Sequence, residues 1–330
     1  MTRRELLRLG VIGGAGALGG YIAGRAGNGG HRVVTPMGPN PHATMPGDSL
    51  YSHGVEPPES LGPQALDMLT IPPPFEPGAR GRARRFELTA LEMPVEVARG
   101  RTFQAWSYNG TVPGPILRAT EGDQLAVHYT NKGSHPHNVH FHGTHDVNQD
   151  GWEPVPVGGE VTYRFTAEPF GVHPYHCHAL PVSEHMAHGL YGTMIVDPPG
   201  GRPAARELVL AFSGFDLDGD GQNDLYAWNG VAGFFARYPI KVPVGELVRI
   251  YLVNLSASDP SVSFHLHAQT FDLYRTGTRL VPDERTDTVT LGPLERAILE
   301  FRLPTRGRYM FQPHQQRMAE AGAMGWLAAT

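Results

Sequence analysis

An internal repeat restricts the fold of this chain more than any other feature of its sequence. The polar turn Gly122–Asp123 precedes an apolar segment that ends at Asn131. The polar turn Gly245–Glu246 precedes a similar segment that ends at Asn254. An Asn-Gly pair comes before each segment, and a His-x-His comes after each. Because the motifs recur in the same order, we infer two copies of one structural unit. Each copy has about 115 to 130 residues, which fits a β-sandwich.

Composition and charge narrow the fold class and the kinds of partner. The chain has 330 residues, including 41 glycines and 30 prolines, and 18% of its residues are charged. Such a composition suits many short strands joined by turns more than long helices. We therefore predict an all-β fold with two tandem β-sandwich domains, at residues 85–199 and 200–330. The formal net charge of -5 offers no basic surface, so we expect no nucleic-acid partner.

The first 84 residues differ from the rest of the chain. Thr2–Arg8 contains a twin arginine, and an apolar, glycine-rich stretch follows from Leu9 to Gly24. Residues 1–28 therefore resemble a twin-arginine export signal, which predicts a location in the periplasm, at the cell surface or outside the cell. A membrane anchor is the alternative, but the apolar stretch is shorter than the roughly 20 residues of a spanning helix, so we expect no stable membrane span. Residues 29–84 are rich in Pro, Gly, Ser and His, which indicates an extended arm or linker.

The chain combines a single cysteine, Cys177, with 17 histidines. One cysteine cannot form a disulfide within an exported chain, so metal ligation is the leading explanation for it. In a strand, residues i and i+2 point to the same face. His176 and His178 should therefore point together, with Cys177 between them on the opposite face. The same spacing pairs the imidazoles in two further sets, which are His140 with His142 and His265 with His267.

This arrangement predicts two metal centres back to back across one strand. A metal bound by the Cys177 sulfur would lie on one side, and metal bound by the neighbouring imidazoles would lie on the other. A soft thiolate together with imidazoles suits copper, and a blue-copper centre needs two His and one Cys. His137 and His185 are the candidates for those two imidazoles. A structural zinc site is the alternative, but it would typically use more cysteines and four ligands in all, which leaves most of the histidines unexplained.

Several segments resemble the multicopper oxidases, specifically the two-domain, laccase-like group related to copper nitrite reductase. They are Tyr108–Pro115, His137–Gly143, Tyr175–His178 and Glu184–Gly192. The resemblance covers roughly residues 85–330. It implies that both domains are cupredoxin-like Greek-key β-sandwiches and that the first carries the type 1 copper.

The resemblance also implies up to four coppers per subunit. The type 1 copper would be bound by His137, Cys177 and His185. The type 2 copper would be bound by His140 and His265. One type 3 copper would be bound by His142, His176 and His314, and the other by His178 and His267. The residues expected to take part in catalysis are His140, His142, His176, Cys177, His178, His265, His267 and His314.

Two positions depart from the family pattern. Leu190 stands where the axial methionine of the type 1 copper is expected, and leucine cannot ligate, so we predict a high-potential type 1 centre. Gln312 stands where the last His-x-His of the second domain would begin. An amide oxygen is a weaker ligand for copper than an imidazole, so one type 3 site should be labile or partly empty, with Gln312 as a possible ligand.

The function that the resemblance implies is laccase-type oxidation. Phenols, aromatic amines or low-valent metal ions would give up single electrons, and dioxygen would be reduced to water by four of them. A copper nitrite reductase is the first alternative, although that family carries an aspartate at the position of His140 and lacks the histidine at 178. A periplasmic copper-binding or copper-tolerance protein is the second. Because the related two-domain proteins build their cluster between neighbouring subunits, we also expect a homotrimer.

The segment Asp216–Asp224 resembles a calcium loop. Its spacing of acidic and glycine residues fits such a loop, but the twelfth position holds Ala227 instead of the closing glutamate. An Asp/Gly turn without calcium is the simpler interpretation.

Overall fold

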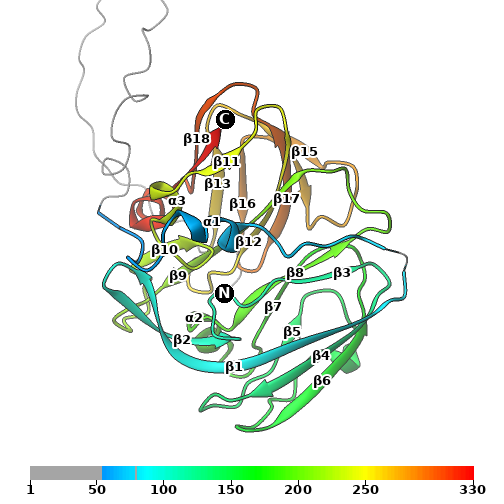
Figure 1. Ribbon diagram of the computed structural model, residues 1–330. Helices are drawn as coiled ribbons and strands as arrows, with labels where there is room; N and C mark the ends of the chain where they lie inside the picture. The colour runs from blue at the N-terminus through cyan, green and yellow to red at the C-terminus, as the bar shows by residue number, and fades with distance from the viewer. Residues whose placement is uncertain (1–53, 79) are drawn as a thin grey trace, which may run out of the picture. The chain divides into compact units, whose positions relative to one another are not determined.

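The computed structural model describes residues 54–330, with the exception of residue 79. The predicted export signal at residues 1–28 and residues 29–53 of the predicted arm lie outside the described residues. Within them, no helix is long and apolar enough to cross a membrane. The predicted fold class is confirmed, because the chain forms two tandem, cupredoxin-like β-sandwiches (Figure 1).

The first sandwich packs two sheets face to face. In the described part of the chain, one sheet has the strand order β2-β1-β4-β6 and the other has the order β3-β8-β7-β5. Several neighbouring strands, such as β1 with β4 and β3 with β8, are not consecutive in sequence, as Greek-key connections require. The strands are β1 (Ala83–Ala98), β2 (Arg101–Tyr108), β3 (Leu117–Thr120), β4 (Gln124–Asn131), β5 (His140–Phe141), β6 (Glu160–Thr166), β7 (Gly171–His176) and β8 (Tyr191–Asp197).

The second sandwich is larger. Among the described residues its two sheets have the strand orders β10-β9-β12-β17-β14-β15 and β11-β19-β18-β13-β16. The strands are β9 (Arg206–Phe215), β10 (Leu225–Trp228), β11 (Ile240–Val242), β12 (Leu247–Asn254), β13 (Val262–Leu266), β14 (Phe271–Arg275), β15 (Glu284–Thr286), β16 (Thr288–Leu291), β17 (Arg296–Arg302), β18 (Gly307–Gln312) and β19 (Gly325–Ala329).

Short helices connect the strands. The helices are η2 (Pro63–Ala65), α1 (Leu66–Thr70), η3 (Val147–Gln149), α2 (Val182–Ala187), α3 (Phe234–Arg237), α4 (Gln316–Met318) and η4 (Ala319–Ala323). Helix α2 positions a predicted copper ligand, because it carries His185 between β7 and β8.

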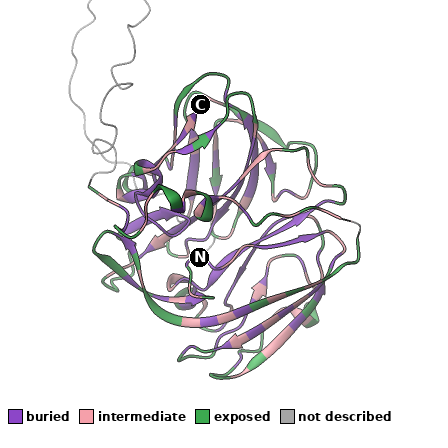
Figure 2. Ribbon diagram, in the orientation of Figure 1, coloured by how far each residue is buried: buried purple, intermediate pink, exposed green. Residues whose placement is uncertain are grey.

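The repeated segments form matching strands with different burial. Strand β4 alternates between buried and more exposed residues, as expected for a strand with one face on the core (Figure 2). Strand β12 is buried along almost its whole length. Val248, Ile250 and Leu252 pack in the core of the second sandwich, whereas Tyr251 and Val253 face a third apolar cluster.

The Asn-Gly pairs adopt the same turn in both domains. Asn109 and Asn229 have φ values of 59° and 55°, and the following glycines also have positive φ. This is the conformation that Asn-Gly favours in a type I′ turn. Each asparagine side chain also ties the turn to a neighbouring strand: Asn109 accepts from the Thr89 amide at 2.6 Å, and Asn229 accepts from the Ala211 amide at 2.7 Å.

The two sandwiches share the third apolar cluster. Its members include Phe103 and Val172 of the first domain and Phe215 and Ile298 of the second. Polar contacts also cross the boundary. Arg118 is paired with Asp197 at 2.8 Å, and its other guanidinium nitrogen lies 2.8 Å from Glu207 of β9. The Val172 amide donates to the Thr276 carbonyl at 2.9 Å. The described domains are therefore packed together as one body.

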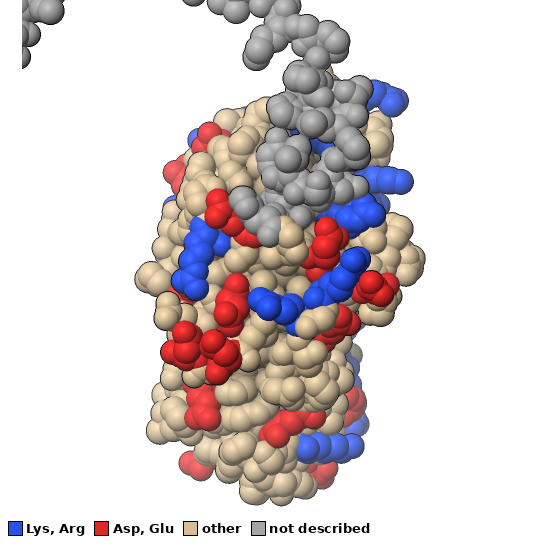
Figure 3. All heavy atoms as spheres, turned by 90° about the vertical axis from the view of Figure 1, so that its left-hand side faces the viewer, with Lys and Arg blue, Asp and Glu red and all other residues tan. Residues whose placement is uncertain are grey.

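Charged side chains are spread over the surface. Figure 3 shows both acidic and basic side chains on one face of the molecule, separated by uncharged surface. Neither sign covers this face continuously, so it provides no extended field for steering a highly charged partner.

Candidate metal centre

Three residues predicted to bind the type 1 copper converge in the first sandwich. Cys177 directly follows β7, His185 lies in α2, and His137 lies between β4 and β5, where its backbone is bridged to Val155. The Nδ1 atoms of His137 and His185 are 2.9 Å apart, and the Cys177 sulfur lies 3.9 Å and 3.2 Å from them. All three side chains are buried. Two imidazole nitrogens and one sulfur around a common point fit the ligand set of a blue-copper site.

Burial shifts the pKa values of these three residues, which determines how they would bind a metal. It lowers the pKa of His137 to about 4, with the nearby His185 as a second cause, so both imidazoles are neutral at pH 7 and can bind metal. Burial raises the pKa of the Cys177 thiol to about 11. A metal bound there would displace the thiol proton, because the thiolate is the ligand.

Leu190 lies next to the sulfur ligand. Its carbonyl accepts the Cys177 amide hydrogen at 2.9 Å, and its side chain is fully buried in the core of the first sandwich. A leucine side chain offers no ligand atom, so Leu190 supplies a dry, apolar wall at this position.

Four histidines of the same domain gather in a second group. His140 of β5 is paired in register with His176 of β7, and the Nε2 atoms of His142 and His176 are 2.9 Å apart. The ring of His178 lies 5.5 Å from that of His140 and 5.9 Å from that of His176, measured between centroids. Burial and the neighbouring imidazoles lower the pKa of His142 to about 3, and burial lowers the pKa of His176 to about 4. The imidazoles of His142 and His176 are therefore neutral at pH 7 and available as ligands.

The two groups of the first domain lie back to back. The Cys177 sulfur faces His137 and His185, while the adjacent residues His176 and His178 contribute their rings to the other group. The Nδ1–H of His176 donates to the Cys177 carbonyl at 2.8 Å, which leaves the His176 Nε2 lone pair free for a metal.

The histidines of the second domain form a third group at the ends of β13 and β18. The ring of His265 lies 4.8 Å from that of His267 and 4.5 Å from that of His314. The Gln312 side-chain nitrogen is 3.4 Å from Nε2 of His267. Gln312 therefore stands beside the imidazole with which it was predicted to share a copper.

The third group is separate from the second within one chain. Among residues 54–330, leaving aside residue 79, the candidate metal-binding groups combine ligand atoms of one domain only. The ring contacts between histidines likewise stay within one domain in this part of the chain. The predicted type 2 pair, His140 with His265, is thus not brought together by one subunit.

Sequence reasoning missed Asp150 and His145. The Asp150 carboxylate lies 3.0 Å from Nδ1 of His140 and 3.4 Å from Nε2 of His145. The Asp150 carbonyl also faces His140 Nδ1, at 3.1 Å. These contacts fix the His140 tautomer and direct its Nε2 toward the neighbouring histidines. Gly151 makes the contact possible, because a Cβ at this position would collide with the Val139 carbonyl.

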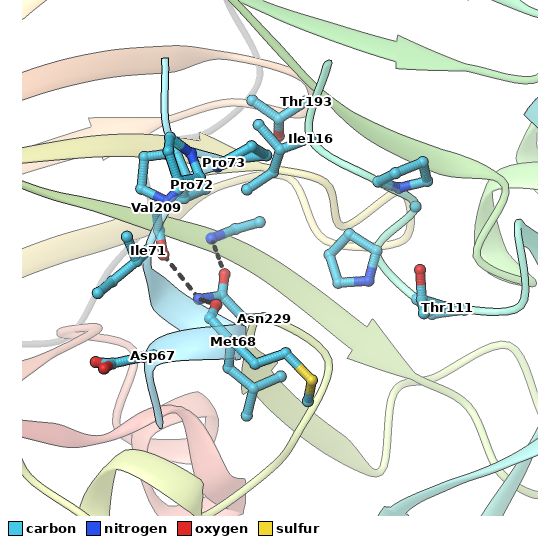
Figure 4. A pocket seen from close by; sticks show the side chains of 17 residues that line it. Asp67, Met68, Ile71, Pro72, Pro73, Thr111, Ile116, Thr193, Val209 and Asn229 are labelled. Atoms are coloured by element: carbon cyan, nitrogen blue, oxygen red, sulfur yellow. Dashed lines mark hydrogen bonds between the residues drawn. The ribbon is translucent and has the colours of Figure 1, made fainter. Parts of the chain in front are cut away.

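One pocket lies beside the predicted type 1 ligands, and a second is lined by residues of both domains. The first has a volume of about 440 Å³ and reaches His185, with Trp106, His135, Trp152 and Glu184 in its walls. The second, of about 510 Å³, is shown in Figure 4 and is lined by residues 67–74, the 111–116 loop and parts of β8 and β9. Asn229 lines this pocket, and its side-chain amide donates to the Leu69 carbonyl at 2.7 Å (Figure 4). None of the residues lining this second pocket is a predicted copper ligand, so the smaller pocket is the candidate donor site.

The calcium-like loop brings three carboxylates together. Asp216, Asp218 and Asp224 have oxygens within 4.8 Å of one another. The Asp216 carboxylate accepts the amides of Gly219 and Gly221 at 2.7 and 2.8 Å, as an Asp/Gly turn does without any ion. Ala227 lies in β10 and contributes no ligand.

The fold and the ligand groups together define a copper protein built from cupredoxin-type domains. Two models of multicopper oxidase domains match the chain, at residues 90–201 and 214–330. The chain is 41% identical to a multicopper oxidase of known structure, with a TM-score of 0.76 over 82% of this chain and 97% of that one. The protein belongs to the multicopper oxidase family, and so to the copper-dependent oxidoreductases.

The relatives include enzymes of two activities. A copper-containing nitrite reductase of Neisseria meningitidis is 30% identical over 79% of this chain and 74% of its own length. The structure of a copper nitrite reductase from Nitrosomonas europaea is 30% identical, with a TM-score of 0.68, over 76% of this chain and 94% of that chain. The multicopper oxidase MmcO of Mycobacterium tuberculosis is 28% identical over 66% of this chain and 51% of its own length.

Proposed function

We propose that this protein is a laccase-type oxidase that couples one-electron oxidation of a small reducing substrate to reduction of dioxygen to water. The observation that carries the proposal is the position of Cys177. Its sulfur belongs to one candidate metal group, while His176 and His178 on either side of it belong to the other. A few covalent bonds therefore connect the two groups.

Copper, when bound, would supply the one-electron redox chemistry and the site for dioxygen. The protein's own residues hold the ligands and exclude water. His137, Cys177 and His185 would bind the type 1 copper in a fully buried pocket. Asp150 would orient His140 through the contact at 3.0 Å. Leu190 would leave the type 1 copper without a strong axial ligand, which favours the reduced ion and a high potential.

The 440 Å³ pocket beside His185 suits a small donor. Trp152 provides an apolar wall, Trp106 contributes only its edge because imidazoles are stacked on its faces, and Glu184 provides a carboxylate. A phenol or aromatic amine fits against such a wall, and a low-valent metal ion could approach the carboxylate. Its volume lies within the usual range of about 300–1,000 Å³ for small-molecule sites.

We further propose a homotrimer in which the third histidine group of one subunit meets the second group of the next. Each subunit keeps the two groups apart, so a complete cluster needs two chains. Trp152, whose ring lies 4.7 Å from that of His178, is 61% exposed, and Val147 and Leu180 are further exposed apolar side chains of the first domain, at 76% and 84%. Large exposed apolar side chains of this kind are typical of interaction surfaces. Native mass measurements should give three times the subunit mass, and an active monomer would contradict this assembly.

Copper counting, combined with visible absorption and electron paramagnetic resonance (EPR), is the direct test of the oxidase. Purified protein should show a blue type 1 band, a type 2 signal and fewer than four tightly held coppers, because of Gln312. It should consume oxygen when a phenol is supplied. A colourless protein that binds a single copper would sink the proposal.

Nitrite reduction is the second candidate, favoured by one observation. The Nε2 atoms of His142 and His176 form a close pair at 2.9 Å, and a third imidazole from a partner's His314 would complete a mononuclear copper site. The test compares nitric oxide release from nitrite with oxygen uptake, using one electron donor for both. Nitric oxide release without oxygen uptake would establish the reductase.

An exported location is proposed with the oxidase. The twin-arginine motif at Arg3–Arg4 supports it, since that route carries folded proteins and would allow a metal site to be filled before export. Replacing both arginines with lysines should keep the protein in the cytoplasm, which cell fractionation would reveal.

A further inference from the structure

A cluster of aromatic rings covers the predicted type 1 ligands on their outer side. Trp106 lies on β2, and both faces of its indole are covered by imidazoles. The His135 ring is stacked on one face, with a centroid distance of 4.7 Å and an interplanar angle of 29°. The His188 ring is stacked on the other, at 4.3 Å and 16°. Neither stacked histidine was predicted to bind copper.

The same indole contacts both imidazoles of the predicted type 1 site. Its centroid lies 5.2 Å from that of His137, with a tilt of 57°, and 5.1 Å from that of His185, in an edge-to-face arrangement at 77°. These two imidazoles reach the site from different parts of the chain, one from a loop and one from α2, a helix of six residues. Trp106 is therefore an aromatic ring that contacts both imidazoles at once.

The stacked histidines are themselves held in place. The His135 ring nitrogen Nδ1 lies 2.9 Å from the Ser134 hydroxyl, and Glu92 accepts the Ser134 amide hydrogen at 2.6 Å. His188 Nδ1 donates to the Glu184 carbonyl at 2.8 Å, and the Trp106 amide donates to the His188 carbonyl at 2.9 Å. The stack is thus fixed to β1, to the loop before His137 and to the end of α2.

We propose that Trp106, held between His135 and His188, is a positioning residue that sets the His137 and His185 imidazoles in copper-binding geometry before the metal enters. We name these three residues the indole clamp. The proposal rests on the assignment of the type 1 ligands made above. Trp106 carries no ligand atom for the metal and acts through the two imidazoles it contacts.

The clamp has two physical effects. It restricts the ring orientations of His137 and His185, so less conformational freedom is lost when copper binds. It also keeps water from the outer side of the two imidazoles, and the dryness of a site affects its reduction potential. Half of the His135 side chain is exposed, so the clamp lies between the ligands and solvent.

The test compares Trp106→Leu with Trp326→Leu. Trp326 is a half-buried tryptophan on β19 of the second sandwich, away from the clamp. In full-length protein loaded with copper, Trp106→Leu should weaken type 1 copper binding by about 10- to 100-fold, the usual cost of losing a residue that supports a metal ligand. It should also shift the type 1 EPR hyperfine splitting and lower the reduction potential. Trp326→Leu should change none of these.

Two further variants keep the proposal falsifiable if Trp106→Leu folds poorly. Trp106→Phe retains a ring and should restore part of the copper affinity. The double variant His135→Ala/His188→Ala retains the indole but frees both of its faces, and should shift the EPR splitting in the same direction by a smaller amount. A purely structural role predicts a lower melting temperature with an unchanged spectrum, potential and copper affinity in the folded protein. That result would overturn the proposal that Trp106 positions the two imidazoles.

Failure of the clamp and failure of the oxidase give different results. If Cys177→Ser protein stays blue, the type 1 assignment itself is wrong. If Cys177→Ser loses the colour while Trp106→Leu keeps wild-type affinity and potential, the type 1 site stands and the clamp alone fails.

Discussion

The two domains place corresponding residues at the same register and use them differently. In the first, His140 of β5 is opposite His176 of β7, and in the second, His265 of β13 is opposite Gln312 of β18. The adjacent pairs are Phe141 with Tyr175 and Leu266 with Phe311. Both domains therefore place polar side chains at the ends of corresponding strands, but β18 ends in an amide where β7 ends in an imidazole.

The domains differ at the positions of the predicted type 1 ligands. Three residues before its His-x-His, the first domain has His137 and the second has the buried Val262. Cys177 follows His176 directly, whereas Pro313 follows Gln312. The second domain fills the space beside its strands with stacked aromatic rings, including Phe264 and Phe311 at 5.8 Å. The two copies share a strand framework with histidines near the strand ends. Only the first copy has the buried thiol together with its two partners, His137 and His185.

The largest effect is expected from replacing Cys177, the residue of the first domain that has no counterpart in the second. Cys177→Ser should abolish the blue absorption and reduce oxygen uptake to background, because the thiolate ligand and the covalent link between the two groups are both lost. The histidine group on the other face should retain copper. Absorption spectra, copper counts and an oxygen electrode provide the measurements. Full activity in this variant would contradict the comparison between the domains.

Removing the carboxylate that orients His140 should have the next largest effect. Asp150→Asn should lower oxidase activity about 10- to 100-fold, since residues that support metal ligands contribute that much. The type 2 EPR signal should change while the type 1 band stays. Asp146→Asn is the matched control, because Asp146 lies in the same loop and caps η3 without a contact to His140. Equal losses in both variants would show that the loop and not the carboxylate is responsible.

The pH dependence of copper binding should differ between the sulfur site and the second domain. The pKa of Cys177 is raised to about 11, so the metal-free thiol is protonated at neutral pH and copper binding releases its proton. Affinity at this site should rise about tenfold per pH unit between about pH 5 and 9. It should fall more steeply near pH 4, where His137 becomes protonated. Burial lowers the pKa of His267, so the contribution of this imidazole to copper binding should be nearly constant above pH 7. Competition titrations at several pH values would measure both slopes.

Replacing Gln312 at the end of β18 with the histidine found at the end of β7 should raise copper affinity at the predicted type 3 site beside it. Gln312→His places an imidazole opposite His265, as His176 lies opposite His140. Copper retained after dialysis against a chelator should increase toward four per subunit, with an affinity gain of roughly tenfold. Gln269→His adds a histidine at a nearby position whose side chain faces the Arg302 carbonyl, and it should leave the count unchanged. Four tightly bound coppers already present in the wild type would refute the weakness assigned to Gln312.

The smallest effect is expected at Leu190. Leu190→Met adds a weak sulfur ligand, which stabilises the oxidised ion and lowers the potential by an amount on the order of tens of millivolts. Copper affinity should hardly change, because three strong ligands remain. A redox titration followed at the blue band is the measurement, and an unchanged midpoint would refute an axial role for this position.

Local patterns predicted the parts of the structure that depend on local sequence. The Asn-Gly turns, the strands ending at Asn131 and Asn254, and the His-x-His pairs all follow from strand geometry and turn preference. The convergence of Cys177 with His137 and His185 was inferred with help from the family resemblance, since α2 and the loop before β5 meet only in the folded domain.

Contacts between distant loops escaped prediction. Asp150 follows His140 by ten residues in a loop with no periodic pattern, and its position depends on how closely Gly151 approaches Val139. Trp106 has the sequence context of an ordinary strand residue, and its stacking partners come from two other segments. The network of Arg118, Asp197 and Glu207 likewise brings together side chains that nothing in the sequence links.

The third apolar cluster has a mechanical consequence. Since Tyr191 and Val209 belong to one continuous apolar cluster, a closing motion of the two described sandwiches would have to break that cluster. One subunit would have to open this cluster to bring its own two histidine groups together. In the proposed trimer, completion of the copper cluster depends on protein concentration, so dilution should abolish activity while the described strands stay folded.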